Sequence, residues 1–118
     1  MKKFLVLYLI PPSVMDEWMK TPPETRKAEE DKMSRGIQEW MRSHSRVFID
    51  PGAGLGKAMR VTQGGTSDAR NSLVMYAIVQ GDSKEAVAKG FQDHPHLQIP
   101  ESSIEVMELF ALPDQAKA

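Results

Sequence analysis

A chain of 118 residues with no cysteine and a net charge of −1 is long enough for one domain with its own hydrophobic core, but it excludes a disulfide framework, a thiolate nucleophile and a cysteine zinc site. Positive and negative side chains are interspersed, so no basic stripe favours a nucleic-acid partner. The lack of cysteine is compatible with a reducing compartment, and we expect a cytoplasmic protein.

The first predicted element is a strand over residues 4–10, FLVLYLI. Its side chains are apolar on both alternating faces, which is typical of a strand that is buried from both sides. Pro11 and Pro12 end it. The apolar run is too short for a membrane span, and no small-residue cleavage site follows it, so we expect neither export nor a membrane partner.

Residues 13–20 predict a short helical or irregular segment, and a long helix follows. Thr21 is its predicted cap, Pro22 its first helical residue and Glu24 its capping-box carboxylate. The helix is expected to run to about Ser43. One stripe of it carries the side chains that we expect to face the core, namely Met33, Ile37, Trp40, Met41 and His44.

Residues 47–50 predict a second strand, and a glycine-rich stretch follows it over 51–57. The stretch does not have the spacing of a phosphate-binding loop, because Pro51 stands where glycine is needed and Ala58 where serine or threonine is needed. We interpret it as a tight loop or bulge within a sheet. Residues 59–62 then look extended, and the glycine- and serine-containing stretch up to residue 71 predicts a hairpin tip.

The rest of the chain predicts a third strand, a second helix and a fourth strand. The third strand covers 73–79 and is apolar on both faces. Asp82 is the predicted cap of the second helix, with Glu85 three residues later, and this helix ends near residue 92. The fourth strand covers 104–110.

This order, βαββαβ, is the ferredoxin-like arrangement of an α+β protein: a four-stranded antiparallel sheet with two helices on one face. The other face would carry apolar residues of the first and third strands, so we expect a homodimer packed sheet to sheet. The alternative is a monomer whose segment over 12–23 folds across this face. We predict one domain over residues 1–112 and a flexible C-terminal tail over 113–118.

Several short stretches of the chain resemble the YCII-related family and its DGPF relatives. They are FLVLY at 4–8, Trp40-Met41, DPGAGLG at 50–56, HPHL at 94–97 and IEV at 104–106. The resemblance implies a dimeric α+β barrel and, for most members, no established function. One relative is described as a dehydrochlorinase, and small members are proposed to use a His-Asp pair.

This chain departs from the pattern of the small members. They place aspartate directly before the proline that is Pro95 here, whereas this chain has His94 at that position and Asp93 one residue earlier. They also carry a histidine in the first helix, and none occurs between Glu24 and Ser43.

The turn from residue 92 to 100 holds two of the three histidines, and we expect both at the rim of the core. His94 follows Phe91 by three residues and Val87 by seven, so its ring should point to the core side near a helix C-terminus, which favours the protonated form. The ring would either cap helix carbonyls or act as a general acid or base in a cleft between helices and sheet. Asp93, His94 and His96 are three possible metal ligands, but Pro95 stiffens the link and no second cluster exists, so we assign no metal site and no cofactor.

We therefore predict His94 as the catalytic acid or base, with Asp93 or Asp50 as its carboxylate partner, and His96, Tyr8 and His44 as ligand-binding residues. The ligand is an unknown small molecule in a cleft near the turn over 94–96.

Two functions remain open at this point: an enzyme of the lyase or isomerase type, and a non-catalytic ligand-binding or accessory homodimer. In an enzyme His94 would line a closed pocket with a carboxylate within hydrogen-bonding distance. In an accessory protein the pocket would be shallow or filled by methionine and aromatic side chains.

Overall fold

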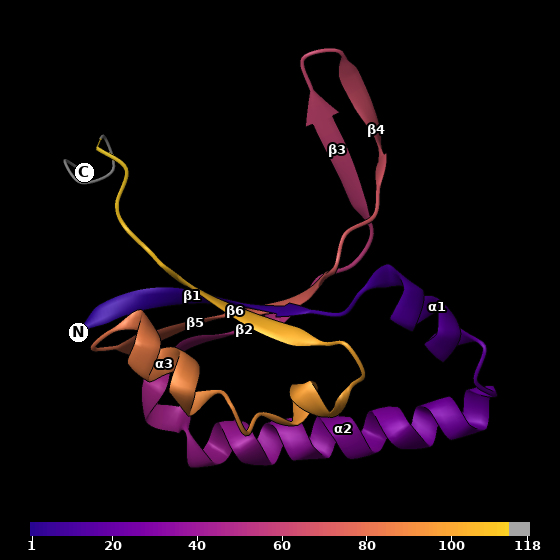
Figure 1. Ribbon diagram of the computed structural model, residues 1–118, viewed down its shortest axis with the longest axis horizontal. Helices are drawn as coiled ribbons and strands as arrows, with labels where there is room; N and C mark the ends of the chain where they lie inside the picture. Colours follow the sequence, from indigo (N-terminus) through magenta and orange to yellow (C-terminus); the bar gives the residue numbers. More distant parts are fainter. Residues whose placement is uncertain (114–118) are drawn as a thin grey trace.

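The computed structural model describes residues 1–113 and shows an α+β protein built on a four-stranded antiparallel sheet with the strand order β2-β5-β1-β6 (Figure 1). The strands are β1 (Lys2–Leu9), β2 (Phe48–Gly54), β5 (Leu73–Gly81) and β6 (Ser103–Glu108). All four were predicted within a few residues of these bounds. The predicted tail lies outside the described residues, except for Pro113.

Three α-helices accompany the sheet, and two of them, α2 and α3, lie on the same side of it (Figure 1). The helices are α1 (Pro12–Met19), α2 (Pro23–Ser43) and α3 (Lys84–Gly90), and the short 3₁₀ helices are η1 (Ser45–Val47) and η2 (Pro95–Gln98). The helix α1 corresponds to the segment over residues 13–20, which was predicted to be either helical or irregular. The histidine-containing turn forms η2.

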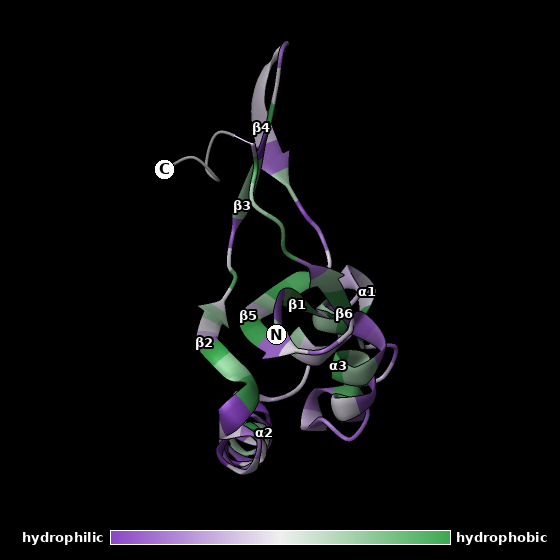
Figure 2. Ribbon diagram, turned by 90° about the vertical axis from the view of Figure 1, so that its left-hand side faces the viewer, coloured by the Kyte–Doolittle hydropathy of each residue, from purple (hydrophilic) through white to green (hydrophobic). Residues whose placement is uncertain are grey.

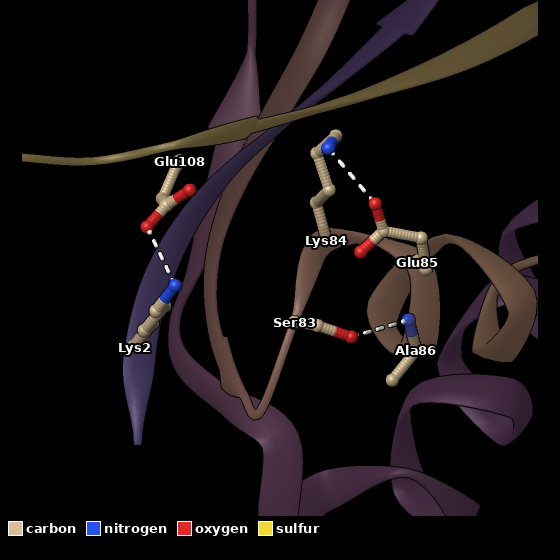
Figure 3. A network of polar contacts seen from close by, with 6 residues as sticks. All are labelled: Lys2, Ser83, Lys84, Glu85, Ala86 and Glu108. Carbon is tan, nitrogen blue, oxygen red and sulfur yellow. Dashed lines mark hydrogen bonds and ion pairs between the residues drawn. The ribbon is translucent and has the colours of Figure 1, made fainter.

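The predicted caps of α2 and α3 are both wrong by one residue. Pro22, not Thr21, precedes α2, and it has the extended angles φ −53° and ψ 141° with no side-chain cap. The reason is Pro23, because a residue before proline is excluded from the helical region. The cap of α3 is Ser83, whose Oγ accepts a hydrogen bond of 3.1 Å from the N–H of Ala86 (Figure 3).

The core lies between the sheet and the helices α2 and α3. Alternate residues of β1 point into it, and Phe4, Val6 and Tyr8 are almost fully buried. They pack with buried residues from α2, β5, α3 and the turn that follows α3, which are Trp40, Ala77, Val79, Val87 and Phe91.

The opposite side of the sheet has no helix on it, and we call it the helix-free face. Strand pairing places on it the half-buried apolar residues Leu5, Leu7, Tyr76 and Ile78, with Met107 at the edge. The segment over 12–23 does not fold across this face. It runs past the end of the sheet to α2 (Figure 1), where the Nε1–H of Trp18 donates to Glu30 at 3.4 Å.

The glycine-rich stretch begins as a bulge in β2, which confirms the interpretation of a bulge within a sheet. The pairing of β2 with β5 shifts register on both sides of Asp50, whose Oδ1 accepts a hydrogen bond of 2.8 Å from the N–H of Gly52. Gly52 has a φ of +79°, and a Cβ at this position would collide with the carbonyl oxygen of Tyr76. Only glycine fits the backbone here.

Between β2 and β5 the chain forms a separate two-stranded ribbon of β3 (Ala58–Thr62) and β4 (Gly65–Ala69). The sequence predicted an extended stretch and a hairpin tip in this region. The ribbon projects away from the sheet on the side opposite α2 (Figure 2). Among residues 1–113, β3 and β4 form ladder pairs only with each other.

Candidate functional site

The two histidines of the predicted site lie inside the molecule and not at the rim of the core. His94 is 1% exposed and His96 is 3% exposed. They flank Pro95 at the start of η2, which lies between α3 and β6 on the α2 side of the sheet (Figure 1). The rim prediction is wrong because α2 covers η2, and sequence spacing around the turn gives no sign of that contact.

The two ring nitrogens of His94 have different environments. Its Nδ1 accepts a hydrogen bond of 3.0 Å from the N–H of His96, so this nitrogen caps η2. A neutral imidazole that accepts at Nδ1 carries its proton on Nε2. Within the described part of the chain, this buried Nε2 has no hydrogen-bond partner. The ring is therefore a capping group at one end and an unsatisfied donor at the other.

Aromatic rings surround His94. The ring centroids of Trp40, Tyr8 and Phe91 lie 4.5, 5.1 and 6.0 Å from its own. Burial in this apolar environment and, to a smaller extent, the nearby His96 lower the pKa of His94 to about 4, although the Asp93 charge opposes the change. The prediction that a helix C-terminus favours the protonated ring is wrong, because α3 ends at Gly90 and His94 instead precedes η2 as its N-cap residue.

His96 connects two strands. Its Nε2 lies 3.0 Å from the carbonyl oxygen of Leu9 and 3.2 Å from that of Ser103, so it donates to the last residue of β1 and the first residue of β6. Burial lowers the pKa of His96, and the two carbonyl contacts oppose that change. These contacts hold the ring in place between the two strands. His96 is only 3% exposed, so its ring is not accessible to a ligand.

Neither predicted carboxylate partner is hydrogen-bonded to His94. Asp93 is exposed, and its Oδ1 accepts a hydrogen bond of 3.0 Å from the Nε1–H of Trp40, which lowers the pKa of this carboxyl. Asp50 pairs with Ile78 and so belongs to the helix-free face, where its side chain holds the β2 bulge. The structure brings Asp93 near His94 in space, but it gives the carboxylate a different partner.

Tyr8 and His44, the remaining predicted ligand-binding residues, both belong to the aromatic cluster. Tyr8 is 1% exposed, and burial raises the pKa of its hydroxyl to about 12. His44 follows the end of α2, where its ring stacks on Trp40 with centroids 3.9 Å apart and its Nδ1 lies 2.8 Å from the carbonyl oxygen of Trp40. The half-buried His44 borders a cleft between the end of α2 and α3.

Two open clefts flank α3, and His94 lines neither of them. The smaller has a volume of about 230 Å³ and lies between the end of α2 and α3, with Trp40, His44, Asp82 and Phe91 in its wall.

The larger has a volume of about 350 Å³, and we call it the α3–β6 cleft. Its lining residues are Lys84, Glu85, Ala88, Phe91, Gln92, Leu97, Ile104 and Val106.

The α3–β6 cleft is mainly apolar, with its charged residues at one end. Lys84 and Glu85 begin α3 and form an ion pair of 2.8 Å on the side toward β6 (Figure 3). Sequence analysis missed this set of residues, except that Phe91 was expected on the apolar side of the helix. The alternation of Ile104 and Val106 was the available signal, because it marks the side of β6 that faces α3.

Residues 1–113 contain no group of three histidine, aspartate or glutamate side chains that could hold a metal ion. In the same range, no helix has the length and apolar character of a membrane span. No protein-family model matches the sequence, and no curated protein matches it either.

Proposed function

We propose that this chain is a ligand-binding homodimer, related to the YCII and DGPF proteins, that takes a small and mainly apolar molecule in its α3–β6 cleft. The observation that carries this proposal is the cleft itself. Its volume of about 350 Å³ falls within the range of about 300–1,000 Å³ that is usual for small-molecule sites, and its wall is apolar with a few polar groups at one end. It also borders the histidine-containing turn through Gln92 and Leu97.

The position of the His94 side chain agrees better with a binding protein than with an enzyme that uses His94 as its acid or base. A general base needs to reach the substrate and to have a pKa near the working pH. His94 lines neither of the two clefts beside α3, has no carboxylate hydrogen-bonded to its ring, and has a pKa of about 4. Aromatic side chains fill the space around it, which was the arrangement expected for the non-catalytic alternative.

The catalytic alternative has one observation in its favour. The Nε2–H of His94 is a buried donor without an acceptor in the described residues, and buried polar groups usually have partners. A lyase or isomerase that opened this cluster would use this donor on its substrate.

The homodimer is supported by the helix-free face. The strand order β2-β5-β1-β6 with α2 and α3 on one side agrees with a ferredoxin-like arrangement, which leaves the other face of the sheet without helices. The resemblance to the YCII-related family implies that this bare face packs on that of a second chain. Apolar residues such as Leu7 and Tyr76 occupy this face, and the segment over 12–23 leaves it uncovered. The absence of cysteine supports a cytoplasmic location.

A binding screen with a filled cleft tests the proposal. Small aromatic and carboxylic metabolites are added to ¹⁵N-labelled protein, and amide shifts of Leu97 and Val106 are followed. Ala88 lies exposed in the wall of the cleft, so Ala88→Trp should fill it and remove binding without disturbing the core. Ala28→Trp, on an exposed position of α2, is the matched control and should bind as the unmodified chain does. Equal binding by both variants, or no ligand in the screen, would contradict the proposed site.

A further inference from the structure

Two segments of the chain project from the sheet on the side of the helix-free face (Figure 1). One is the β3–β4 ribbon, residues 58–69, which we call the hairpin arm. The other is the stretch after β6, residues 109–113, which we call the C-terminal arm. They leave the sheet at opposite ends, so the helix-free face lies between them.

One side of the hairpin arm carries two large apolar side chains that nothing in residues 1–113 buries, beside Thr66 and Asp68 of β4. Met59 and Val61 point to the same side of β3 and are 63% and 77% exposed. Arg60 and Thr62 point to the other side. A two-stranded ribbon is at best marginally stable alone in water, so this arm needs a surface to pack against.

The C-terminal arm is also apolar. Leu109, Phe110 and Leu112 are 41%, 81% and 56% exposed. The arm begins in a fixed position, because the N–H of Leu109 donates to the carbonyl oxygen of Lys3 at 2.9 Å. Large apolar side chains gathered in this way mark an interaction surface.

The area of the sheet indicates why arms would be needed in a dimer. Four strands about 4.8 Å apart, with about six residues each rising about 3.4 Å, outline a face of about 400 Å². A stable interface of standard size buries about 800 Å² on each partner. The flat outline of the helix-free face is smaller than this accessible area, and the apolar residues of the two arms are the nearest surface that would enlarge the interface.

We propose that the hairpin arm and the C-terminal arm pack on a second copy of this chain that is docked on the helix-free face. This inference rests on the proposed homodimer and names the residues that extend its interface. A twofold dimer suits these arms, because each chain then supplies one pair of arms and receives one pair, which closes the assembly without leaving either apolar side free.

Alternate residues of β3 provide a matched test. The double variant Met59→Ser/Val61→Ser removes the apolar side of the hairpin arm, and Arg60→Ser/Thr62→Ser changes the other side of the same strand. Dissociation constants come from sedimentation velocity over a dilution series, with circular dichroism as a check on folding. The first variant is expected to raise the dissociation constant at least about tenfold, as loss of central apolar interface contacts does, and the second should stay within about twofold of the unmodified chain. Phe110→Ser, in the other arm, should also raise it.

The outcomes separate this inference from the dimer itself. If the unmodified chain dimerises and neither Met59→Ser/Val61→Ser nor Phe110→Ser weakens it, the arms do not pack on the partner, and the dimer through the sheet still stands. If the unmodified chain is monomeric throughout, the homodimer and the packing of the arms are both wrong. Equal weakening by the Arg60→Ser/Thr62→Ser control would also overturn the assignment of the apolar side.

Discussion

His94 combines a capping role at one ring nitrogen with an unsatisfied proton at the other, and it is a buried group whose charge state differs between the native and the unfolded chain. The rings of Tyr8, Trp40 and Phe91 reduce its hydration. Burial then favours the neutral form, and the native ring titrates at about 4 instead of 6.5. An unfolded chain would lack this environment.

We expect the free energy of unfolding to fall as the pH drops from 6.5 to about 4. In this window the unfolded chain binds a proton on His94 and the native chain does not, so protonation favours unfolding. Above pH 6.5 neither state is protonated, and His94 adds no pH dependence. The shift in pKa corresponds to about 3 kcal/mol over the window. Urea unfolding at a series of pH values measures it.

The control for this measurement is His94→Asn, whose amide oxygen can still accept from the N–H of His96 but does not titrate. Its pH dependence between 4 and 6.5 should be smaller by about the same 3 kcal/mol. The Asp93 carboxyl, whose pKa is lowered by the hydrogen bond from Trp40, is present in both proteins, so its contribution cancels in the comparison. Identical slopes for His94→Asn and the unmodified chain would show that the native ring is not held neutral.

For His94, the sequence predicted the direction of the side chain correctly but not the residues that surround it. The spacing of His94 from Phe91 and Val87 correctly indicated that the ring points inward. It did not indicate that Trp40 of α2 packs against that ring. It also did not indicate that the indole N–H of Trp40 donates a hydrogen bond to the Asp93 carboxylate. Both facts depend on contacts between segments far apart in the chain.

Secondary-structure elements were predictable where side-chain pattern and turn chemistry agree. The four strands of the sheet and the helices α2 and α3 follow from their apolar patterns. The start of α2 was misplaced because two consecutive prolines follow Thr21, and Pro23 forces Pro22 to be extended. The shape of the β3–β4 ribbon was only partly predictable, because its exposed strands have no core-facing side.

The β2 bulge gives a prediction at this scale. Gly52→Ala should cost about 3 kcal/mol of stability, because alanine opposes the positive φ and its Cβ would collide with the carbonyl of Tyr76. Gly54→Ala is the matched control: a Cβ there meets only the carbonyl oxygen of Val74, at 3.9 Å, so the cost should be about 0.5 kcal/mol or less. Denaturant unfolding of both variants measures the difference. Equal costs would mean that the bulge does not have this backbone conformation.

In the whole molecule, helices cover one face of the sheet and leave the other face bare. Apolar residues on both sides of the first and third strands predicted this arrangement. The structure places Phe4, Val6 and Tyr8 in the core, and Leu5 and Leu7 on the helix-free face. The candidate site was less predictable. Its cleft joins α3 to β6, and no single stretch of sequence contains both walls.

Sedimentation equilibrium of the unmodified chain at micromolar concentration tests the proposed homodimer most directly. We expect a mass of twice the chain's 13.2 kDa. Leu7→Glu, which places a charge at the centre of the helix-free face, should convert the dimer to a folded monomer, because an unpaired charge in an apolar interface costs several kcal/mol. A single species of 13.2 kDa for the unmodified chain at every concentration would contradict the homodimer.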